Sequence, residues 1–411
     1  MTRPIAITGL GVVSPLGDSP AQFRDALLEG LSAIVPDPKF AAFGCRSTLA
    51  ARVAGFDAAA WIPPMKLRRM DATGPFALVA LRQAMEHAGY AVTADGDPRT
   101  GIVLGTYSAG GQATSEYLDA LFKGGPSGAP ALLFNSTVGN AAAGLAGLEY
   151  KLCGPNATIS QKEASGLGAI VTAADLLRLD RADAVGAGGM DAIFDTFYRA
   201  HDRFGVMSDR AAFDDSHAPF SASRAGFVMG EGGYILWLEP GKEDRRSCAG
   251  EILGTGAASA PCPLNAWPLD PEPIARTMAL AIEDAGLTPA DVHVVYASAN
   301  ATSGLDAVEA RALVELFGPS RPAITSIKGA IGESGASGAA ACAAAALCGA
   351  IGKVPPIAGL RRIDPAARTL ALATSAVDAP GEIALVNSVA SGGALFSVVL
   401  RTPRADKTRE A

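Results

Sequence analysis

Histidine is scarce in this 411-residue chain, which contains only His87, His201, His217 and His293. The six cysteines are scattered without a CxxC or CxxH pair, which argues against a disulfide framework or a zinc site and favours a reducing cytoplasm. Charged residues make up 18%, and the net charge of −7 includes no basic block, so neither nucleic acid nor a membrane surface is an expected partner. The longest small-residue run, at 335–352, is too weakly hydrophobic for a membrane span and fits a buried helix.

The usual fingerprints of cofactor and metal chemistry are also missing. GLGVVS, GAGGMD and GTGAAS each lack the last glycine of GxGxxG, and GAIGK lacks the upstream spacing of a phosphate-binding loop. The string nearest to the nucleophile elbow GxSxG is GESGA, which ends in Ala336. No HExxH or other metal-spaced histidine pair occurs. We therefore expect no metal and no nucleotide cofactor.

Hydrophobic residues make up 49% of the chain, and short apolar segments alternate with longer helical ones, which predicts an α/β fold. The strands lack strict alternation of apolar and polar residues, so most should be covered on both faces. No low-complexity linker occurs, and the nearest boundary predicts halves 1–245 and 246–411 within one compact unit. The expected strands are 4–9, 101–106, 156–160, 183–188, 233–239, 250–256, 292–298, 382–388 and 394–400. The expected helices are 20–32, 73–89, 112–123, 138–150, 163–179, 271–286, 304–317 and 335–352.

One segment of the chain echoes another. SQKEASGLGAIVTAADLL at 160–177 matches AIGESGASGAAACAAAAL at 330–347 in style, with Glu163 and Glu333 each opening an Ala/Gly-rich helix. Small residues let helices run through the middle of a domain with their backbones in near contact. Two halves that each bury such a helix beneath a sheet would explain the echo; coincidence between two small-residue helices is the alternative.

Glu163 has two interpretations. Ser160-Gln-Lys-Glu163 fits the capping box S-x-x-E, whereas a charge at the start of a buried helix also fits a functional position. A buried carboxylate is costly unless it is paired, so Glu163 should accept backbone N–H bonds at its helix start or pair with a base such as Lys328. We expect His217, in DDSHAPF, to be solvated and His293 to be structural.

Several stretches together resemble the β-ketoacyl synthases of the thiolase superfamily. The matching segments are ITGLGVVSPLG at 7–17, ADAVGAGGMDA at 182–192, APFSASRAGFVMGEGG at 218–233, SIKGAIGESGASGAA at 326–340 and NSVASGGALFSVVL at 387–400. They follow the family's order from residue 7 to about 400. The resemblance implies an α/β thiolase-like fold, in which two pseudo-symmetric halves form five αβαβα layers with mixed sheets.

Carried over position by position, the family's catalytic residues are absent. The nucleophilic cysteine falls on Glu163, the two catalytic histidines fall on Ser298 and Glu333, and the gating phenylalanine falls on Ser391. Condensation needs a nucleophile to hold the acyl chain and donors to stabilise the enolate and oxyanion. The resemblance therefore implies that the chain does not catalyse condensation by itself. The polar family residues that keep their identity are Lys328, Asp306 and Glu309.

Among ketosynthase-like proteins that lack the catalytic residues, the chain resembles the chain length factor, the β subunit of type II polyketide synthases. In that group the turn reads xxEQAGGLDA, and here SQKEASGLGA places Glu163 where the usual glutamine stands. LDAVEARAL at 305–313 is also typical of the group. The resemblance implies that the chain forms a cytoplasmic heterodimer with an active ketosynthase. This complex is expected to make a polyketide in an antibiotic biosynthesis pathway. The product could be aromatic or a reduced polyene, and we favour the latter slightly.

In this family the growing chain is carried by the phosphopantetheine of a separate acyl carrier protein, so no cofactor of the chain's own is implied. The resemblance places an interface helix that lines the tunnel within 107–125. Gln112, Ser115, Glu116 and Asp119 then share one face of that helix, because they follow i, i+3, i+4, i+7 spacing. Without the resemblance, an ordinary solvated helix face explains this spacing equally well.

Two other functions compete with the chain length factor. The first is a decarboxylase or initiation subunit that generates an acetyl starter from malonyl carrier protein, although the enzymes of this kind retain both histidines. The second is a partner subunit that only stabilises the ketosynthase and leaves the product unchanged.

Overall fold

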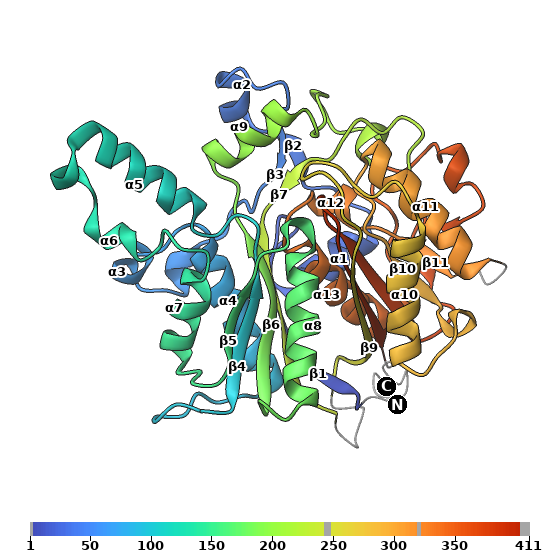
Figure 1. The fold of residues 1–411 in the computed structure, drawn as a ribbon, viewed down its shortest axis with the longest axis horizontal. Coiled ribbons are helices and arrows are strands. Elements are labelled where there is room, and N and C mark those ends of the chain that lie inside the picture. The colour runs from blue at the N-terminus through green and yellow to red at the C-terminus, as the bar shows by residue number, and fades with distance from the viewer. Residues whose placement is uncertain (1–2, 242–247, 319–321, 403–411) are drawn as a thin grey trace.

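The computed structural model describes residues 3–241, 248–318 and 322–402. One mixed sheet runs through the molecule in the order β13-β11-β10-β15-β16-β9-β1-β8-β6-β4-β5 (Figure 1). Its strands are β1 (Ile5–Val13), β4 (Thr100–Gly105), β5 (Asn156–Ile159), β6 (Ala184–Asp191), β8 (Gly232–Pro240), β9 (Gly250–Ser259), β10 (Val294–Tyr296), β11 (Ala323–Thr325), β13 (Ala371–Leu372), β15 (Ile383–Val389) and β16 (Ala394–Arg401).

The two halves of this sheet repeat one topology. From the centre outward, the strands run β1-β8-β6-β4-β5 on one side and β9-β16-β15-β10-β11 on the other. In each half the first two neighbour pairs are antiparallel and the next two are parallel. β1 pairs with β9 where Ile5 faces Ile252 and so joins the halves. The two pseudo-symmetric halves are thus confirmed, while the predicted boundary between residues 245 and 246 lies outside the described residues.

Helices form three layers around the two half-sheets (Figure 1). On the outside of the first half, α4 packs on β1, β8 and β6, and on the outside of the second half α10 packs on β9 and β16 and also contacts α11. Between the half-sheets lie α8 and α13, which contact each other. This arrangement is the predicted αβαβα order. The helices of these layers are α4 (Thr73–Ala88), α8 (Ser165–Arg178), α10 (Glu272–Asp284), α11 (Ser303–Phe317) and α13 (Ser337–Ala350).

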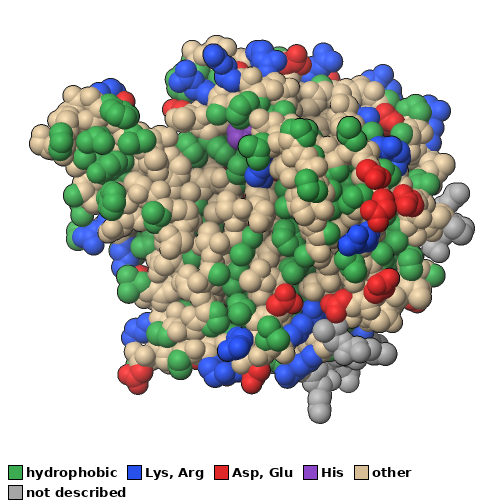
Figure 2. All heavy atoms as spheres, viewed as in Figure 1, with side chains coloured by type: hydrophobic (Ala, Val, Ile, Leu, Met, Phe, Trp, Pro, Cys, Tyr) green, Lys and Arg blue, Asp and Glu red, His purple; other side chains and the backbone are tan. Residues whose placement is uncertain are grey.

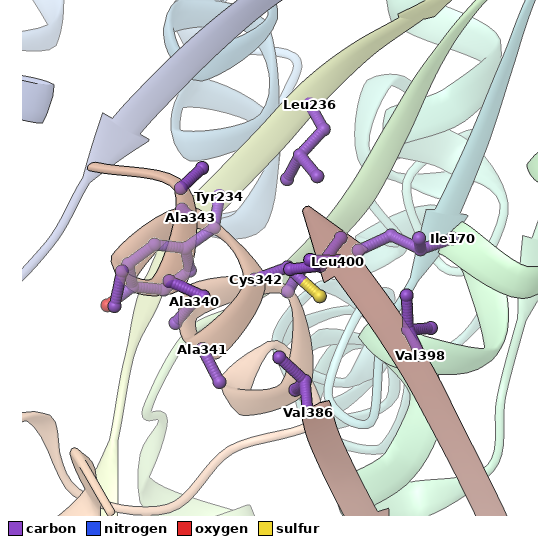
Figure 3. Packing of buried hydrophobic residues seen from close by; sticks show 14 of the residues in the cluster. Ile170, Tyr234, Leu236, Ala340, Ala341, Cys342, Ala343, Val386, Val398 and Leu400 are labelled. Atoms are coloured by element: carbon purple, nitrogen blue, oxygen red, sulfur yellow. The ribbon is translucent and has the colours of Figure 1, made fainter. Parts of the chain in front are cut away.

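The two central helices approach each other through small residues. A Cβ atom on Gly338 would lie 2.7 Å from the Cβ of Leu167, and the Gly166 N–H donates to the Gly335 carbonyl at 2.7 Å. Alanines of α13 pack on both half-sheets in the core around Cys342, which lies close to Leu400 in Figure 3. The Ala/Gly echo in the sequence therefore reflects close helix packing in a duplicated fold.

Every strand and helix expected from the sequence is present, with bounds shifted by a few residues. All nine residues of β1 are buried, as expected for a strand covered on both faces. The remaining predicted helices are α1 (Pro20–Leu28), α5 (Gly111–Gly124) and α7 (Ala141–Tyr150). The helices and strands not predicted are short, except for α9: α2 (Pro38–Ala42), α3 (Pro64–Leu67), α6 (Ala131–Phe134), α9 (Asp195–Phe204), α12 (Lys328–Ile331), β2 (Ile34–Pro36), β3 (Leu49–Ala51), β7 (Met229–Gly230), β12 (Lys353–Val354), β14 (Val377–Asp378) and the sheet strands β11 and β13.

Helices α5 and α6 project from the body on the side of the first half-sheet (Figure 1). Within the part of the chain that the structure describes, no helix has the length and apolar character needed to cross a membrane.

Candidate functional site

The residues at the family's catalytic positions meet where the two central helices begin. Glu163 lies in a 3-10 turn, Lys162–Ala164, directly before α8, and Glu333 lies between α12 and α13. Both carboxylates line one small cavity. Ser298 follows β10, and its hydroxyl accepts a hydrogen bond from Lys328. Ser391 follows β15, and its hydroxyl donates to the Glu163 carboxylate. The duplicated topology brings them together, because equivalent turns of the two halves face each other.

Glu163 is held by Ser391. The Glu163 side chain is buried, and its carboxylate accepts the Ser391 backbone N–H at 3.0 Å and the Ser391 hydroxyl at 2.9 Å. The predicted capping box was wrong, since the 3-10 turn has no side-chain cap and the Gln161 N–H donates instead to Ser165 Oγ at 2.8 Å. The expectation of a buried, hydrogen-bonded carboxylate is confirmed, but its partner comes from a distant strand end.

Lys328 pairs with Glu333 and not with Glu163, which corrects the suggested partner. Its Nζ donates to Glu333 Oε2 at 2.7 Å and to the Ser298 carbonyl at 2.7 Å, and it lies 3.3 Å from Ser298 Oγ. Asn300 Nδ2 donates to the same Glu333 oxygen at 2.8 Å. Burial raises the pKa of Glu333, the Lys328 ammonium opposes that rise, and the Glu163 carboxylate adds to it. The pair satisfies two charges that would be costly to bury alone.

The two retained acids bind the backbone of the loop that carries Ser298. Asp306 accepts the N–H groups of Phe220 at 2.7 Å and Asn300 at 2.9 Å. Glu309 accepts the Ser298 N–H at 2.8 Å and the Asn387 side-chain amide at 2.6 Å. Burial raises the pKa of Asp306 to about 7 and also raises the pKa of Glu309. Both acids therefore position the loop and do not line the cavity.

Three polar residues of the cavity wall, Asp191, Tyr107 and His201, were not predicted from the sequence. Asp191, at the end of β6, is buried and accepts the N–H groups of Tyr107, Ser108 and Gly335, so it ties the loop after β4 to the start of α13. Tyr107 and His201 also line the cavity. The glycine-rich strand ending in Asp191 was noticed, but nothing in the sequence connects the other two to Glu163.

The remaining histidines lie away from the cavity. The expectation that His217 is solvated was wrong: its ring is buried, Ser208 Oγ lies 3.0 Å from Nε2, and the Asp214 N–H donates to Nδ1 at 3.2 Å. It thus closes a 3-10 turn instead of facing water. His293 accepts the Ile383 N–H at 3.4 Å beside the sheet. Among the described residues, no cluster of His, Cys, Asp and Glu is arranged to hold a metal ion.

A second, larger space lies beside α5. Gln112, Ser115, Glu116 and Asp119 all line this groove and so lie on one side of the helix, while their role at a tunnel or an interface stays a prediction. The groove has a volume of about 620 Å³, against about 10 Å³ for the cavity at Glu163. Its other wall comes from β2, α2, β3 and the segment before α9, and includes Arg52.

The chain belongs to the β-ketoacyl synthase family. The model of the β-ketoacyl synthase N-terminal domain matches residues 2–243, and that of the C-terminal domain matches residues 249–361. The strand order and the layers described above are those of the thiolase-like fold of this family.

Relatives include catalytic and polyketide proteins. The chain is 30% identical to the 3-oxoacyl-acyl-carrier-protein synthase 2 of Coxiella burnetii, over 80% of this chain and 81% of that protein. It is 31% identical to the tetracenomycin polyketide synthase ketoacyl synthase beta subunit of Streptomyces glaucescens, over 79% and 80%.

Two solved structures of ketosynthases are similar along nearly the whole chain. The ishigamide ketosynthase/chain length factor matches with a TM-score of 0.89 and 26% identity, covering 98% of this chain and all of that one. A type II polyketide synthase acyl-carrier protein in complex with its ketosynthase matches with a TM-score of 0.87 and 25% identity, with the same coverage.

Proposed function

We propose that this chain is a non-catalytic chain length factor, which pairs with an active ketosynthase and contributes a wall of the tunnel that sets polyketide length. One observation carries the proposal. At the position of the family's nucleophile stands Glu163, whose carboxylate is held by Ser391, and the nearby Lys328 ammonium is bound to Glu333 and Ser298.

This arrangement is unsuited to condensation. A carboxylate at residue 163 cannot carry the acyl chain as a thioester. The developing enolate and oxyanion need donors, yet Glu333 presents a carboxylate where a histidine donor is required, and the Lys328 ammonium is already bound. The cavity of about 10 Å³ has room for about one water molecule. The residues and the space both argue against acyl transfer in this chain.

An exposed apolar surface supports a protein partner. Figure 2 shows hydrophobic side chains gathered over the α5–α6 projection, and α7 and the loop before it also carry exposed apolar side chains. Phe122 is 81% exposed and Leu148 is 80% exposed. Water-exposed clusters of this kind usually mark interfaces. The surface, here called the α5–α7 apolar surface, comprises Leu118, Phe122, Leu132, Phe134, Val138 and Leu148.

The groove beside α5 is our candidate for this chain's part of the tunnel. It adjoins the α5–α7 apolar surface, because Gln112 and Asp119 lie on the same helix as Phe122. A ketosynthase seated on that surface would cover this side of α5. The growing chain would then arrive on the phosphopantetheine of a separate acyl carrier protein, as the relation to the carrier-protein complex suggests.

Co-expression tests the proposal directly. The tagged chain is co-expressed and purified with an active type II ketosynthase from the same source, and the mass of the intact complex is measured. We expect a heterodimer that elongates malonyl carrier protein, with no elongation by either chain alone. A stable monomer or homodimer that does not bind the ketosynthase would contradict the proposal.

Carbon dioxide release distinguishes the decarboxylase alternative. The purified chain is incubated with malonyl carrier protein, and we expect release no faster than the background rate. Release that Glu163→Ala abolishes would instead identify a decarboxylase. Unchanged products from complexes with altered groove residues would favour a stabilising subunit.

A further inference from the structure

Tyr107 lines the cavity at Glu163 and lies nearer the surface than the two carboxylates. It follows β4, and its ring lies edge-on to the rings of Phe197 and His201, with centroid distances of 4.9 and 5.4 Å. Glu163 and Glu333 are only 4% and 3% exposed, whereas Tyr107 is half-buried. Tyr107 therefore lines the cavity and is itself partly exposed to solvent.

A hydrogen bond to His201 fixes the ring in this position. The His201 Nδ1 atom lies 2.9 Å from the Phe197 carbonyl oxygen, which can only accept, so Nδ1 carries the proton. Nε2 is then an acceptor, and the Tyr107 hydroxyl donates to it at 3.0 Å. Burial lowers the pKa of His201 and raises the pKa of Tyr107, so both groups stay neutral near pH 7 and the bond keeps this direction.

Lys162 also contacts the Tyr107 ring. Its Nζ lies 5.6 Å from the centre of the Tyr107 ring and contacts the Leu264 carbonyl oxygen. The segment carrying Leu264 is in turn bound to the turn after Ser391, because the Gly392 N–H donates to the Ala266 carbonyl at 3.0 Å. The segment that carries Leu264 and Ala266 is thus hydrogen-bonded both to the Glu163 turn and to the turn after Ser391.

We propose that Tyr107 and His201 form a stopper that closes the Glu163 cavity to acyl thioesters. The remaining space of about 10 Å³ holds about one water molecule and cannot hold even an acetyl thioester. The site has then lost acyl binding by closure as well as by loss of the nucleophile. This inference concerns the chain by itself and does not require a partner or a product.

A thiol placed at the floor of the cavity tests the stopper. Glu163→Cys provides the thiol, and the rate of its alkylation by chloroacetyl-pantetheine is measured by peptide mass spectrometry, which separates it from the six native cysteines. The rate is compared with that of E163C/Y107A. The control is E163C/Y117A, which removes a half-buried tyrosine of α5 that packs on Phe134 outside the cavity.

We expect alkylation of the introduced thiol to be at least tenfold faster in E163C/Y107A than in E163C and unchanged in the control. A second variant, E163C/Y107F, keeps the ring and removes the bond to His201; we expect at least a threefold increase, and circular dichroism checks each fold. If E163C/Y107A does not fold, the alkylation rate of E163C/Y107F tests the proposal. Equal rates in E163C and in the Tyr107 variants would overturn the stopper, and that result would leave the proposed function untouched.

Discussion

Ser391 donates two hydrogen bonds to Glu163, one from its backbone N–H at 3.0 Å and one from its hydroxyl at 2.9 Å. In the family these two positions belong to the nucleophile and the gate. In this chain Glu163 and Ser391 are both buried and are hydrogen-bonded to each other. The contact joins the turn before α8 to the turn after β15.

Glu163→Ala should destabilise the fold by about 1–3 kcal/mol, because the Ser391 N–H is left buried without an acceptor. Glu163→Gln should cost less, since its amide oxygen still accepts that N–H and its length is unchanged. The free energy of unfolding in urea measures both variants. Equal losses in the two would show that Ser391 does not depend on an acceptor at 163.

Lys328→Met should cost about 3–5 kcal/mol, since Glu333 is then buried without its cation. The double variant K328M/E333Q removes both charges and should recover part of the loss. The control is Lys353→Met, which breaks the exposed pair with Asp378 and should cost about 0–1 kcal/mol. Denaturant unfolding of all three gives the comparison. A K328M loss as small as that of the control would contradict the buried pair.

The stability cost of Asp306→Asn should fall as pH rises. Burial raises the pKa of Asp306 from 3.8 to about 7, so between these values the folded protein binds a proton that the unfolded chain does not. This site makes the parent less stable as pH rises to about 7, by at most about 1.4 kcal/mol per pH unit, whereas Asn does not titrate. Unfolding at pH 5, 6, 7 and 8 measures the difference. A cost that is constant or grows with pH would show that Asp306 is ionised throughout.

Gln112→Ala or Asp119→Ala should shift product length in the complex with the ketosynthase. Both side chains line the groove of about 620 Å³, and smaller ones leave more room for the growing chain. The products are identified by mass spectrometry. Glu86→Ala is the control, an exposed acid on α4 that does not line the groove. Identical products from all variants would show that α5 does not line the tunnel.

Phe122→Asp or Leu148→Asp should weaken ketosynthase binding at least tenfold, about 1.4 kcal/mol, because a charge then enters an apolar contact. Leu269→Asp is the matched control, since Leu269 is 84% exposed but lies outside the α5–α7 apolar surface. Co-purification and titration of the complex report the affinity. Equal binding by all three would place the ketosynthase on another surface.

Much of the fold could be predicted from the sequence. The alternation of short apolar segments with longer helical ones indicated the long helices except α9, and the sheet strands except the short β11 and β13. The echo between the segments at Glu163 and Glu333 indicated a duplicated unit, since only small residues fit where Gly166 and Gly338 bring two helices together. The resemblance to the family, carried over position by position, also predicted that Glu163, Ser298 and Glu333 stand where catalytic residues are expected.

The contacts within the site were decided by tertiary structure. Glu163 met Ser391, 228 residues away, while the local capping pattern at Ser160 was not used. Lys328 paired with Glu333 instead of Glu163, and His201 reached Tyr107 across the cavity. The sequence by itself determined most of the long helices and strands, and its resemblance to the family indicated where catalytic groups are absent. Only the folded arrangement decided which buried groups became partners, because hydrogen bonding depends on distances and directions that a linear pattern does not contain.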